Sequence, residues 1–212
     1  MDPDSVEVLS QKKRTLTFSR GETVFHLGDS AGFFYCINDG KVQLYRSSPY
    51  REQSFAILGK GDWLGHRDVI AGGEYRHNAR CLTKTTVCKF PADELLNHME
   101  KSPRFASQVA HNLAHSWIES EHQSYNLGAR KVMERLADFL LSLQGENNGI
   151  DAANQEIDLN LTREMLATLM GTTTESVIRT LSDFKARGWI KMDKGRVCFI
   201  NAKELGKLVE EA

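Results

Sequence analysis

The stretch LTREMLATLMGTTTESVIR, residues 161–179, decides how the C-terminal part of this chain folds. Thr162 can cap a short helix through its hydroxyl group, and Gly171 predicts that this helix ends in a tight turn. A second helix then opens at residues 172–174. The core positions of the two helices are Leu166, Ala167, Leu169, Met170, Val177 and Leu181. A small residue, a glycine four positions later and a β-branched residue six positions after the glycine form the spacing of a helix-turn-helix.

A β-hairpin is expected directly after these helices. Its strands are Trp189-Ile-Lys-Met and Arg196-Val-Cys-Phe-Ile, and Asp193-Lys-Gly195 supplies the turn between them. A hairpin in this place is a wing, so the sequence predicts a winged helix-turn-helix.

The outer side of the second helix carries groups that can recognise DNA. Arg179, one turn beyond Glu175, can donate two hydrogen bonds to a guanine edge, and Glu175 can accept one from a cytosine amino group. Hydroxyl and amide groups at helix N-termini suit phosphate oxygens. The predicted DNA-binding residues are Thr162, Arg163, Thr172, Thr173, Thr174, Glu175, Ser176 and Arg179. Residues 163–196 hold seven Lys or Arg and four Asp or Glu, so this segment is positive although the whole chain has a net charge of −1.

Two other interpretations of this segment stay open. Glu175 can instead pair with Thr172 in a capping box, in which case it contacts no base. A winged helix-turn-helix can also bind a protein, which would make the chain a ligand-binding regulatory module that acts on a protein partner. Salt-sensitive binding to DNA separates these functions, because phosphate contacts release counterions.

Short strands separated by turns are predicted for the N-terminal part. Turn signals recur between residues 20 and 74, and Asp39-Gly40 is a strong hairpin signal because a two-residue type I′ turn requires positive φ. Val42-x-Leu44 and Phe55-x-Ile57 alternate as half-buried strands do, and residues 81–90 predict one further strand rich in β-branched residues. This pattern favours a β-barrel or jelly roll.

A long helix is predicted between these two regions. Residues 91–93 can start a short helix and Pro103 a longer one, because proline fits the first turn of a helix. The longer helix has a heptad seam that a two-chain coiled coil would bury, although a helix packed on its own barrel can show the same stripe. The seam residues are Ala106, Ala110, Leu113, Trp117, Ser120, Ser124 and Leu127. Gly128 then interrupts the helix as a hinge, and an amphipathic helix and a polar loop at residues 144–155 follow.

The composition is that of a globular protein, with 212 residues, 41% of them hydrophobic and 26% charged. No apolar run approaches the roughly 18 residues that span a bilayer, and the N-terminus lacks the apolar core of a signal peptide. We therefore expect a cytoplasmic protein that does not contact the membrane. Free thiols are expected at Cys36, Cys81, Cys88 and Cys198, which form no Cys-x-x-Cys pair.

Further motifs carry a resemblance to a known family. They are Gly21-Glu-x-Val-Phe-x-x-Gly28-Asp29, Gly40-x-Val-x-Leu and Gly61-Asp-x-Leu-Gly65. With the helix-turn-helix, they make nearly the whole chain similar to the Crp/Fnr family, the bacterial transcription factors of the cyclic-AMP receptor protein and fumarate–nitrate reduction regulator type. The resemblance implies a homodimer that binds double-stranded DNA at a palindromic operator and contacts RNA polymerase.

The fold that the sequence and the resemblance predict together is α+β. Residues 1–102 are expected to form a cyclic-nucleotide-binding-like sensor barrel of the cupin type, a double-stranded β-helix or jelly roll. Residues 103–127 are the expected dimerisation helix, and residues 128–212 the expected winged helix-turn-helix domain.

The resemblance also implies an effector site, from which this chain departs. The cyclic-AMP branch carries Gly-Glu and then Arg-Ser, where this chain has Gly65-His66 and Arg76-His77. Arg76 can still pair with a phosphate or carboxylate. However, the ribose-binding glutamate is replaced by His66, and Glu121 would add negative charge to a pocket for an anion. We therefore expect an unidentified effector, rather than cyclic AMP, to bind at Gly65, His66, Arg76, His77, Ser120 and Glu121.

Haem is an alternative, because imidazole is a common axial ligand, and it would make the chain a gas or redox sensor of the same fold. His66, His77 and the histidines of the long helix are candidate ligands. Three histidines also share one face of the long helix, namely His111, His115 and His122. We interpret that face as solvated rather than metal-binding, because Asn112 stands where a zinc protease motif requires glutamate. An enzyme is not expected, since neither Gly-x-Ser-x-Gly nor a phosphate-binding loop is present.

The resemblance leaves the operator sequence open. Glu175 and Arg179 match the base-reading positions of the family. Thr174 stands where the cyclic-AMP branch carries arginine, and Ile178 stands where the other branch usually carries serine. The sequence therefore predicts base reading without fixing which bases are read.

Overall fold

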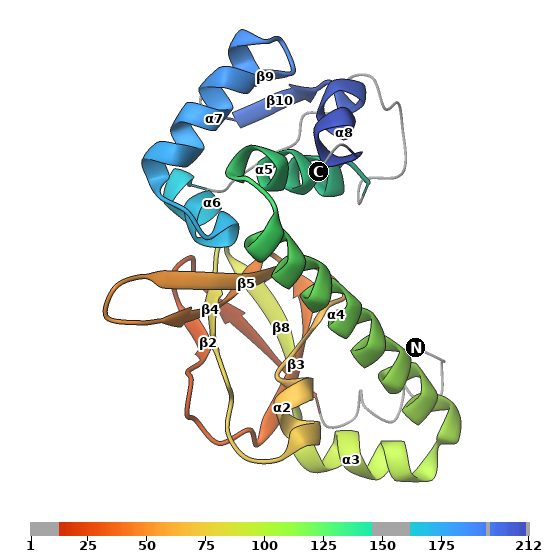
Figure 1. Ribbon diagram of the computed structural model, residues 1–212. Coiled ribbons are helices and arrows are strands. Elements are labelled where there is room, and N and C mark those ends of the chain that lie inside the picture. Colours follow the sequence, from red (N-terminus) through yellow and green to blue (C-terminus); the bar gives the residue numbers. More distant parts are fainter. Residues whose placement is uncertain (1–12, 146–161, 194–195, 211–212) are drawn as a thin grey trace. The chain divides into compact units, whose positions relative to one another are not determined.

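The computed structural model describes residues 13–145, 162–193 and 196–210 (Figure 1). The chain divides into two compact units, residues 1–119 and 120–212, and the long helix α4 (Pro103–Ala129) contributes to both. The other elements of the first unit are β1 (Arg14–Phe18), β2 (Thr23–Phe25), β3 (Phe33–Asp39), β4 (Val42–Ser47), β5 (Glu52–Leu58), β6 (Trp63–Leu64), α2 (His66–Ala71), β7 (Asn78–Cys81), β8 (Thr85–Pro91) and α3 (Ala92–Lys101).

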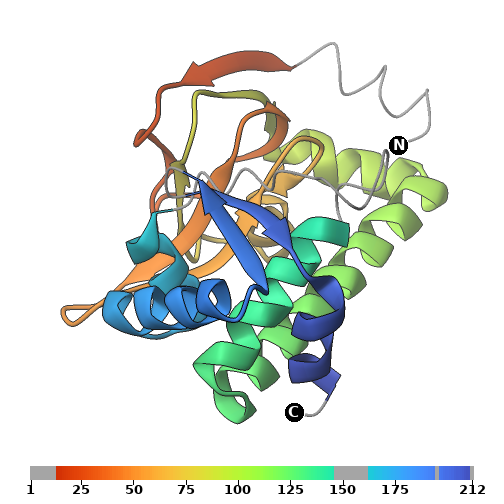
Figure 2. The same ribbon diagram turned by 90° about the horizontal axis from the view of Figure 1, so that it is seen from above.

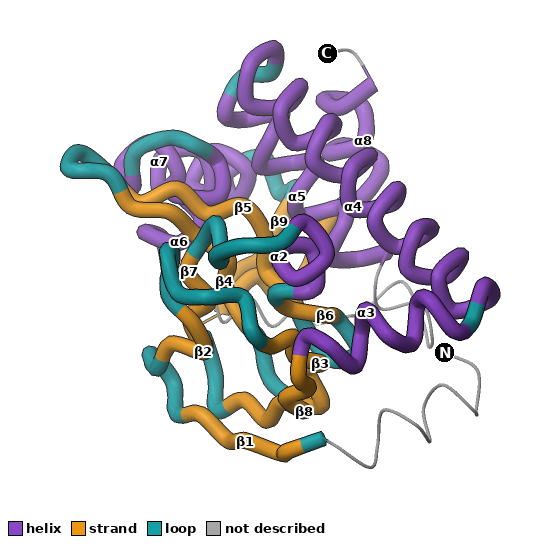
Figure 3. The backbone as a smooth tube through the Cα atoms, turned by 90° about the horizontal axis from the view of Figure 1, so that it is seen from below, coloured by secondary structure: helices purple, strands orange, loops and turns teal. Residues whose placement is uncertain are grey.

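Two antiparallel sheets build the first unit. One has the strand order β1-β8-β3-β6 and the other β2-β7-β4-β5, and both can be followed as the orange segments in Figure 3. Their inner faces meet in one hydrophobic core, because alternate residues of each strand point to the same side. Val42 and Leu44 of β4 are buried as predicted, but Gln43 and Tyr45 are buried too, so β4 does not alternate in burial. Ile37 and Val87 face each other across β3 and β8.

The predicted hairpin at Asp39-Gly40 is wrong. Strands β3 and β4 flank this turn but belong to different sheets, so the turn carries the chain from one sheet to the other. Gly40 is still required there, because its φ is 96° and a Cβ atom would lie 2.5 Å from the hydroxyl oxygen of Thr85. The hairpin that does form joins β4 to β5, with Ser47 opposite Glu52.

Two strand predictions need correction for a similar reason. Residues 81–90 do not form one strand, because β7 ends at Cys81 and β8 begins at Thr85 in the other sheet. In β5, Phe55 is 42% exposed, whereas Ala56 and Leu58 pack against the core. The register of β4 against β5 shifts between Leu44 and Tyr45, which changes the residues that face inward.

Helices α3 and α4 begin where the prolines predict, at Ala92 after Pro91 and at Pro103. Leu95 of α3 and Phe105 and Val109 of α4 complete the core of the first unit. Most positions of the predicted heptad seam are open to solvent in the single chain. Leu113 packs partly buried against that core, whereas Ala110, Ser120, Ser124 and Leu127 are exposed and Trp117 is exposed by 68%.

The second unit contains α5 (Val132–Gly145), α6 (Arg163–Met170), α7 (Thr174–Ala186), β9 (Ile190–Asp193), β10 (Arg196–Ile200) and α8 (Ala202–Glu210). Its core takes side chains from each helix, including Leu136, Leu166, Leu181 and Leu205. Strands β9 and β10 pair as the predicted antiparallel hairpin, visible as the two blue arrows in Figure 2, and Lys194 and Gly195 of its turn lie outside the described residues. The predicted loop at residues 144–155 lies outside them from residue 146 onward.

Gly128 does not interrupt the long helix, which continues to Ala129. The bend follows at residues 130–131, and Arg135 of α5 holds it. One guanidinium nitrogen of Arg135 donates to the carbonyl oxygens of Leu127 and Arg130, both at 3.1 Å. The last carbonyl groups of a helix lack partners inside it, so Arg135 closes the end of α4.

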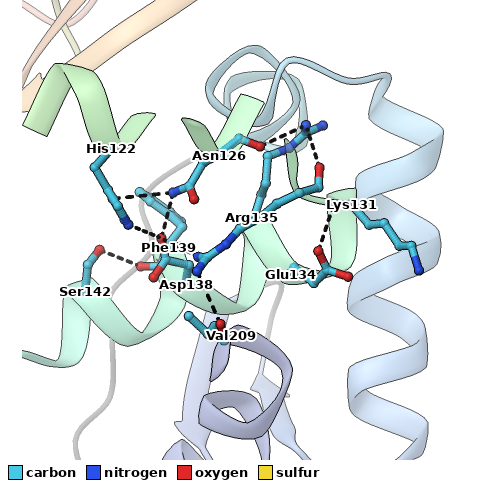
Figure 4. A network of polar contacts seen from close by, with 10 residues as sticks. His122, Asn126, Lys131, Glu134, Arg135, Asp138, Phe139, Ser142 and Val209 are labelled. Carbon is cyan, nitrogen blue, oxygen red and sulfur yellow. Dashed lines mark hydrogen bonds and ion pairs between the residues drawn. The ribbon is translucent and has the colours of Figure 1, made fainter. Parts of the chain in front are cut away.

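Asp138 gathers a second set of contacts at this bend (Figure 4). Its Oδ2 accepts a hydrogen bond from the Asn126 amide at 2.8 Å and lies 3.6 Å from the Arg130 guanidinium. His122 Nε2 is 3.9 Å from the same oxygen. Arg130 also donates to the carbonyl of Val209 at 3.2 Å, so the ends of α4 and α8 are both tied to α5.

None of the helices in the described part of the chain combines the length and the hydropathy of a membrane-spanning segment. Cys36, Cys81 and Cys88 are free thiols, as expected, while the side chain of Cys198 lies outside the described part.

Candidate DNA-binding surface and effector pocket

Helix α6 is capped at both ends as predicted. The Thr162 hydroxyl accepts a hydrogen bond from the Met165 amide at 3.2 Å, and Gly171 adopts a left-handed conformation with φ of 60°. Ala167 is 4% exposed where the two helices meet. These features fix the turn that places α7.

Helix α7 starts one residue later than a capping box at Thr172 requires. Thr173 is the N-cap, and its hydroxyl accepts from the Ser176 amide at 3.3 Å. Ser176 is therefore the third helical residue, and the alternative role of Glu175 as capping-box partner is wrong. A hydrogen bond from its own backbone N–H and then the Thr173 hydroxyl lower the pKa of Glu175, so its carboxylate is an acceptor at neutral pH.

One face of α7 stays free of the core. Val177, Leu181 and Phe184 face inward. Glu175, Ile178, Arg179 and Ser182 form an outer stripe, defined here as the outer face of α7, and all four are exposed. Of the other predicted DNA-binding residues, Thr162 and Thr173 are exposed, while the half-buried ones are Arg163, Thr172, Thr174 and Ser176.

A cluster of buried polar side chains lies in the first unit, at α2 and the segment before β7. His66 is 5%, Asp68 4% and His77 9% exposed. Burial, followed by the Arg67 charge, lowers the pKa of His66 from 6.5 to about 4. Asn112 and the Trp63 backbone lie close to the His66 ring and act to raise its pKa, but neither forms a hydrogen bond of ordinary geometry with the ring.

His77 is shifted in the same direction. Burial lowers its pKa, the Asp68 charge opposes that effect, and Arg67 and Arg46 add to it. One oxygen of Asp68 accepts from the Arg76 amide at 3.3 Å, while its other oxygen and His77 Nε2 are buried without a hydrogen-bond partner in the described part of the chain. Both imidazoles are therefore neutral at pH 7, and polar atoms among them have unused hydrogen-bonding capacity.

Positive charge surrounds this cluster. Arg67 and Arg76 are exposed, and Arg46 donates to the Arg76 carbonyl. Gly65, the N-cap residue directly before α2, has a φ of 73°, and a Cβ atom there would lie 2.7 Å from the Tyr75 ring. The requirement for glycine at this position is thus steric.

The structure brings together only part of the predicted effector site. Gly65, His66, Arg76 and His77 lie in the first unit, whereas Ser120 and Glu121 are exposed residues of the second. Asp68 belongs to the buried cluster and was not predicted, because an aspartate inside a short helix gives no local signal of burial. Among the described residues, no group of three or more His, Cys, Asp or Glu side chains could hold a metal ion.

Comparison with known proteins matches each of the two units to a domain family. The Cyclic nucleotide-binding domain family matches residues 15–102, and the Crp-like helix-turn-helix domain family matches residues 134–208. The chain is 26% identical over 208 residues to the CRP-like cAMP-activated global transcriptional regulator of Mycobacterium tuberculosis, covering 98% of this chain and 93% of that protein. It is 26% identical over 189 residues to the nitrogen fixation regulation protein FixK of Bradyrhizobium diazoefficiens, covering 89% and 78%.

The fold has close counterparts among solved structures. FixK2 from Bradyrhizobium japonicum superposes with a TM-score of 0.83 at 22% identity, covering 92% of this chain and 96% of that one. A cyclic-nucleotide-binding-type β unit followed by a helix-turn-helix defines the class of effector-controlled transcription regulators. Within that class, the chain belongs to the Crp/Fnr family. It is a DNA-binding transcription regulator and not an enzyme.

Proposed function

We propose that the chain acts in the cytoplasm as a homodimer that reads a palindromic operator with the outer face of α7. The two sheets of the first unit serve as a jelly-roll sensor barrel, and the β9–β10 hairpin is the wing. The two recognition helices of the dimer, about 34 Å apart, would enter successive major grooves. The dimer bound to its operator would then contact RNA polymerase. The observation that carries this proposal is the outer face of α7, where Glu175 and Arg179 are ionic, exposed and one helical turn apart.

The helix-turn-helix also supplies the remaining contacts of this proposal. Thr162, Arg163, Thr172 and Thr173 lie at the N-terminal ends of α6 and α7, where backbone amides and hydroxyls suit phosphates. Phosphate contacts position the protein, and base contacts select the sequence. Losing one of each kind should therefore have different effects.

Arg179→Ala tests the base-reading role. An operator is first selected from randomised DNA with the full chain, and affinities for it and for random DNA are then measured at several salt concentrations. Arg179→Ala should weaken operator binding by about 1–3 kcal/mol and leave binding to random DNA nearly unchanged. Lys185→Ala, a basic residue in the last turn of α7, is the matched control. An equal loss on both DNAs would contradict base reading, and a wild-type chain that selects no sequence would contradict the proposal.

The dimer rests on the apolar surface of α4. Trp117 is 68%, Ile118 62% and Tyr125 53% exposed, and such exposure on one helix is typical of an interaction site. Light scattering after gel filtration should give twice the chain mass for the wild type. Ile118→Glu should reduce that mass, whereas Ser107→Glu, at an exposed polar position of α4, should not.

The effector of this proposal is a small anion held at Gly65, His66, Arg76 and His77. Ser120 and Glu121, the other two predicted residues, belong to the second unit, and the charge of Glu121 does not suit an anion. The charges of Arg46, Arg67 and Arg76 outnumber that of Asp68, which favours an anion. Cyclic AMP is disfavoured, since the carboxylate expected to hold its ribose is His66 here. Coupling of about 1–3 kcal/mol between effector and operator would change DNA affinity about 5–150-fold.

Thermal shift with inorganic phosphate and with cyclic nucleotides tests the effector class. Phosphate should stabilise the wild type more than Arg76→Ala, while Arg20→Ala, at an exposed site outside the cluster, should behave as the wild type. Stabilisation by cyclic AMP alone would contradict the proposed class. An absorption spectrum of the purified chain with a Soret band would favour the haem alternative, with His66 or His77 as ligand.

A further inference from the structure

Ile178 is an apolar side chain in the middle of an otherwise polar outer face of α7. It is 48% exposed, and among the described residues from 162 to 210 it is the large apolar side chain left open to solvent. Glu175 lies three positions before it and Arg179 directly after it. An apolar group between two charged base-reading candidates therefore faces whatever the outer face of α7 binds.

The hydroxyl groups around Ile178 are turned toward the helix backbone. Ser182 Oγ donates to the Ile178 carbonyl at 2.8 Å, and Thr180 Oγ1 donates to the Ser176 carbonyl at 2.8 Å. Neither hydroxyl hydrogen is available for a base. Beside Arg179, the exposed part of Ile178 therefore offers methyl and methylene groups, and these two hydroxyls add no hydrogen-bond donor.

We propose that Ile178 determines operator specificity by packing against the C5-methyl group of a thymine in each half-site. This inference rests on the proposed function of α7 and adds the base that its apolar position selects. In the major groove, thymine differs from the other bases in presenting a methyl group, while their edges present donors or acceptors. Covering a polar edge with isoleucine leaves that edge without a partner, which disfavours the other bases.

The magnitude follows from the size of the group. Burial of a methyl-sized group is worth about fourfold in affinity, so a methyl contact in both half-sites is worth about fifteenfold. An effect of this size is well resolved in a binding titration, and it depends only on the C5-methyl group of the thymine.

Deoxyuridine tests the contact, because it differs from thymidine only in the missing methyl group. In the selected operator, each thymine is replaced in turn by deoxyuridine in both half-sites, and the affinities of the wild type and Ile178→Ala are compared. One symmetric pair of replacements should weaken wild-type binding about fifteenfold. The same pair should have little effect on Ile178→Ala, which already binds the thymine operator more weakly. Lys185→Ala, the control, should keep the wild-type sensitivity.

The outcomes separate this inference from the function on which it rests. A wild type that selects an operator but tolerates deoxyuridine at every position, or selects half-sites without a fixed thymine, overturns the role of Ile178 and leaves the DNA-binding function intact. Equal deoxyuridine sensitivity in Ile178→Ala also overturns it, because another side chain then contacts the methyl group. A chain that selects no sequence overturns the proposed function and this inference with it.

Discussion

Replacement of His66 by glutamine should remove part of the acid sensitivity of the first unit. Burial lowers the pKa of His66 from 6.5 to about 4, so the folded chain binds this proton more weakly than the unfolded chain does. As pH falls through 6.5, the unfolded state gains a proton that the folded state does not take up until about pH 4. Stability that is present above pH 6.5 is therefore lost as the solution becomes more acidic.

The size of this effect can be worked from the two pKa values. A tenfold difference in proton affinity is worth about 1.4 kcal/mol, so His66 accounts for about 2 kcal/mol between pH 7 and pH 5 and about 3 kcal/mol near pH 4. The pKa of His77 is also lowered by burial, and it adds to the loss in the same direction. His66→Gln should therefore reduce the pH dependence and not abolish it.

Urea titrations at pH 7 and pH 5, followed by tryptophan fluorescence, measure this difference. Trp63 reports on the site directly, because its ring packs edge-on against His66 with a centroid distance of 5.6 Å. His111→Gln, at an exposed histidine of α4, is the matched control and should keep the wild-type pH dependence. If His66→Gln loses as much stability between pH 7 and pH 5 as the wild type, the buried neutral imidazole is not the cause.

Three further substitutions probe local features of the two units. Thr173→Ala should destabilise the second unit by about 1 kcal/mol in urea unfolding through loss of the α7 N-cap, and Thr172→Ala should cost less. Gly40→Ala should lower the free energy of unfolding of the first unit by about 1–3 kcal/mol, and with it the melting temperature, because φ is positive and Thr85 blocks the Cβ position. Gly59→Ala, with open space around it, should leave both unchanged. Asp138→Asn should cost about 1–2 kcal/mol, because it keeps the shape but leaves the half-buried Arg130 without its counter-charge, and hydrogen exchange should rise at the start of α5.

The helix-turn-helix could be predicted closely because its signals are local. Thr162, Gly171 and the spacing of apolar residues act within a few positions of each other, and the structure places the caps of α6 there. The partner of a strand is not a local property. Asp39-Gly40 carries the turn chemistry of a hairpin, yet whether the next strand pairs or crosses to another sheet depends on contacts with β7 and β8.

The buried polar cluster of the first unit was harder to predict for the same reason. His66 and His77 were identified from their places in a motif, but Asp68 joins them only through the packing of α2. The sequence placed the start of α7 at residues 172–174 without choosing its N-cap, because Thr172, Thr173 and Thr174 have equal capping chemistry. Their three-dimensional setting, with Thr172 still following the α6 turn, decides among them.

The bend held by Arg135 and Asp138 has a practical consequence for protein engineering. Asn126 of α4 is bonded to Asp138 of α5, and Arg130, directly after α4, is bonded to Val209 of α8, so a fragment from Ser120 onward keeps its own N-terminal helix segment. A foreign coiled coil fused in helical phase ahead of Ser120 would therefore be joined to the C-terminal unit by a continuous helix and not by a flexible linker. In chimeric regulators, the sensor unit could be exchanged at this fusion point without redesign of the DNA-binding unit.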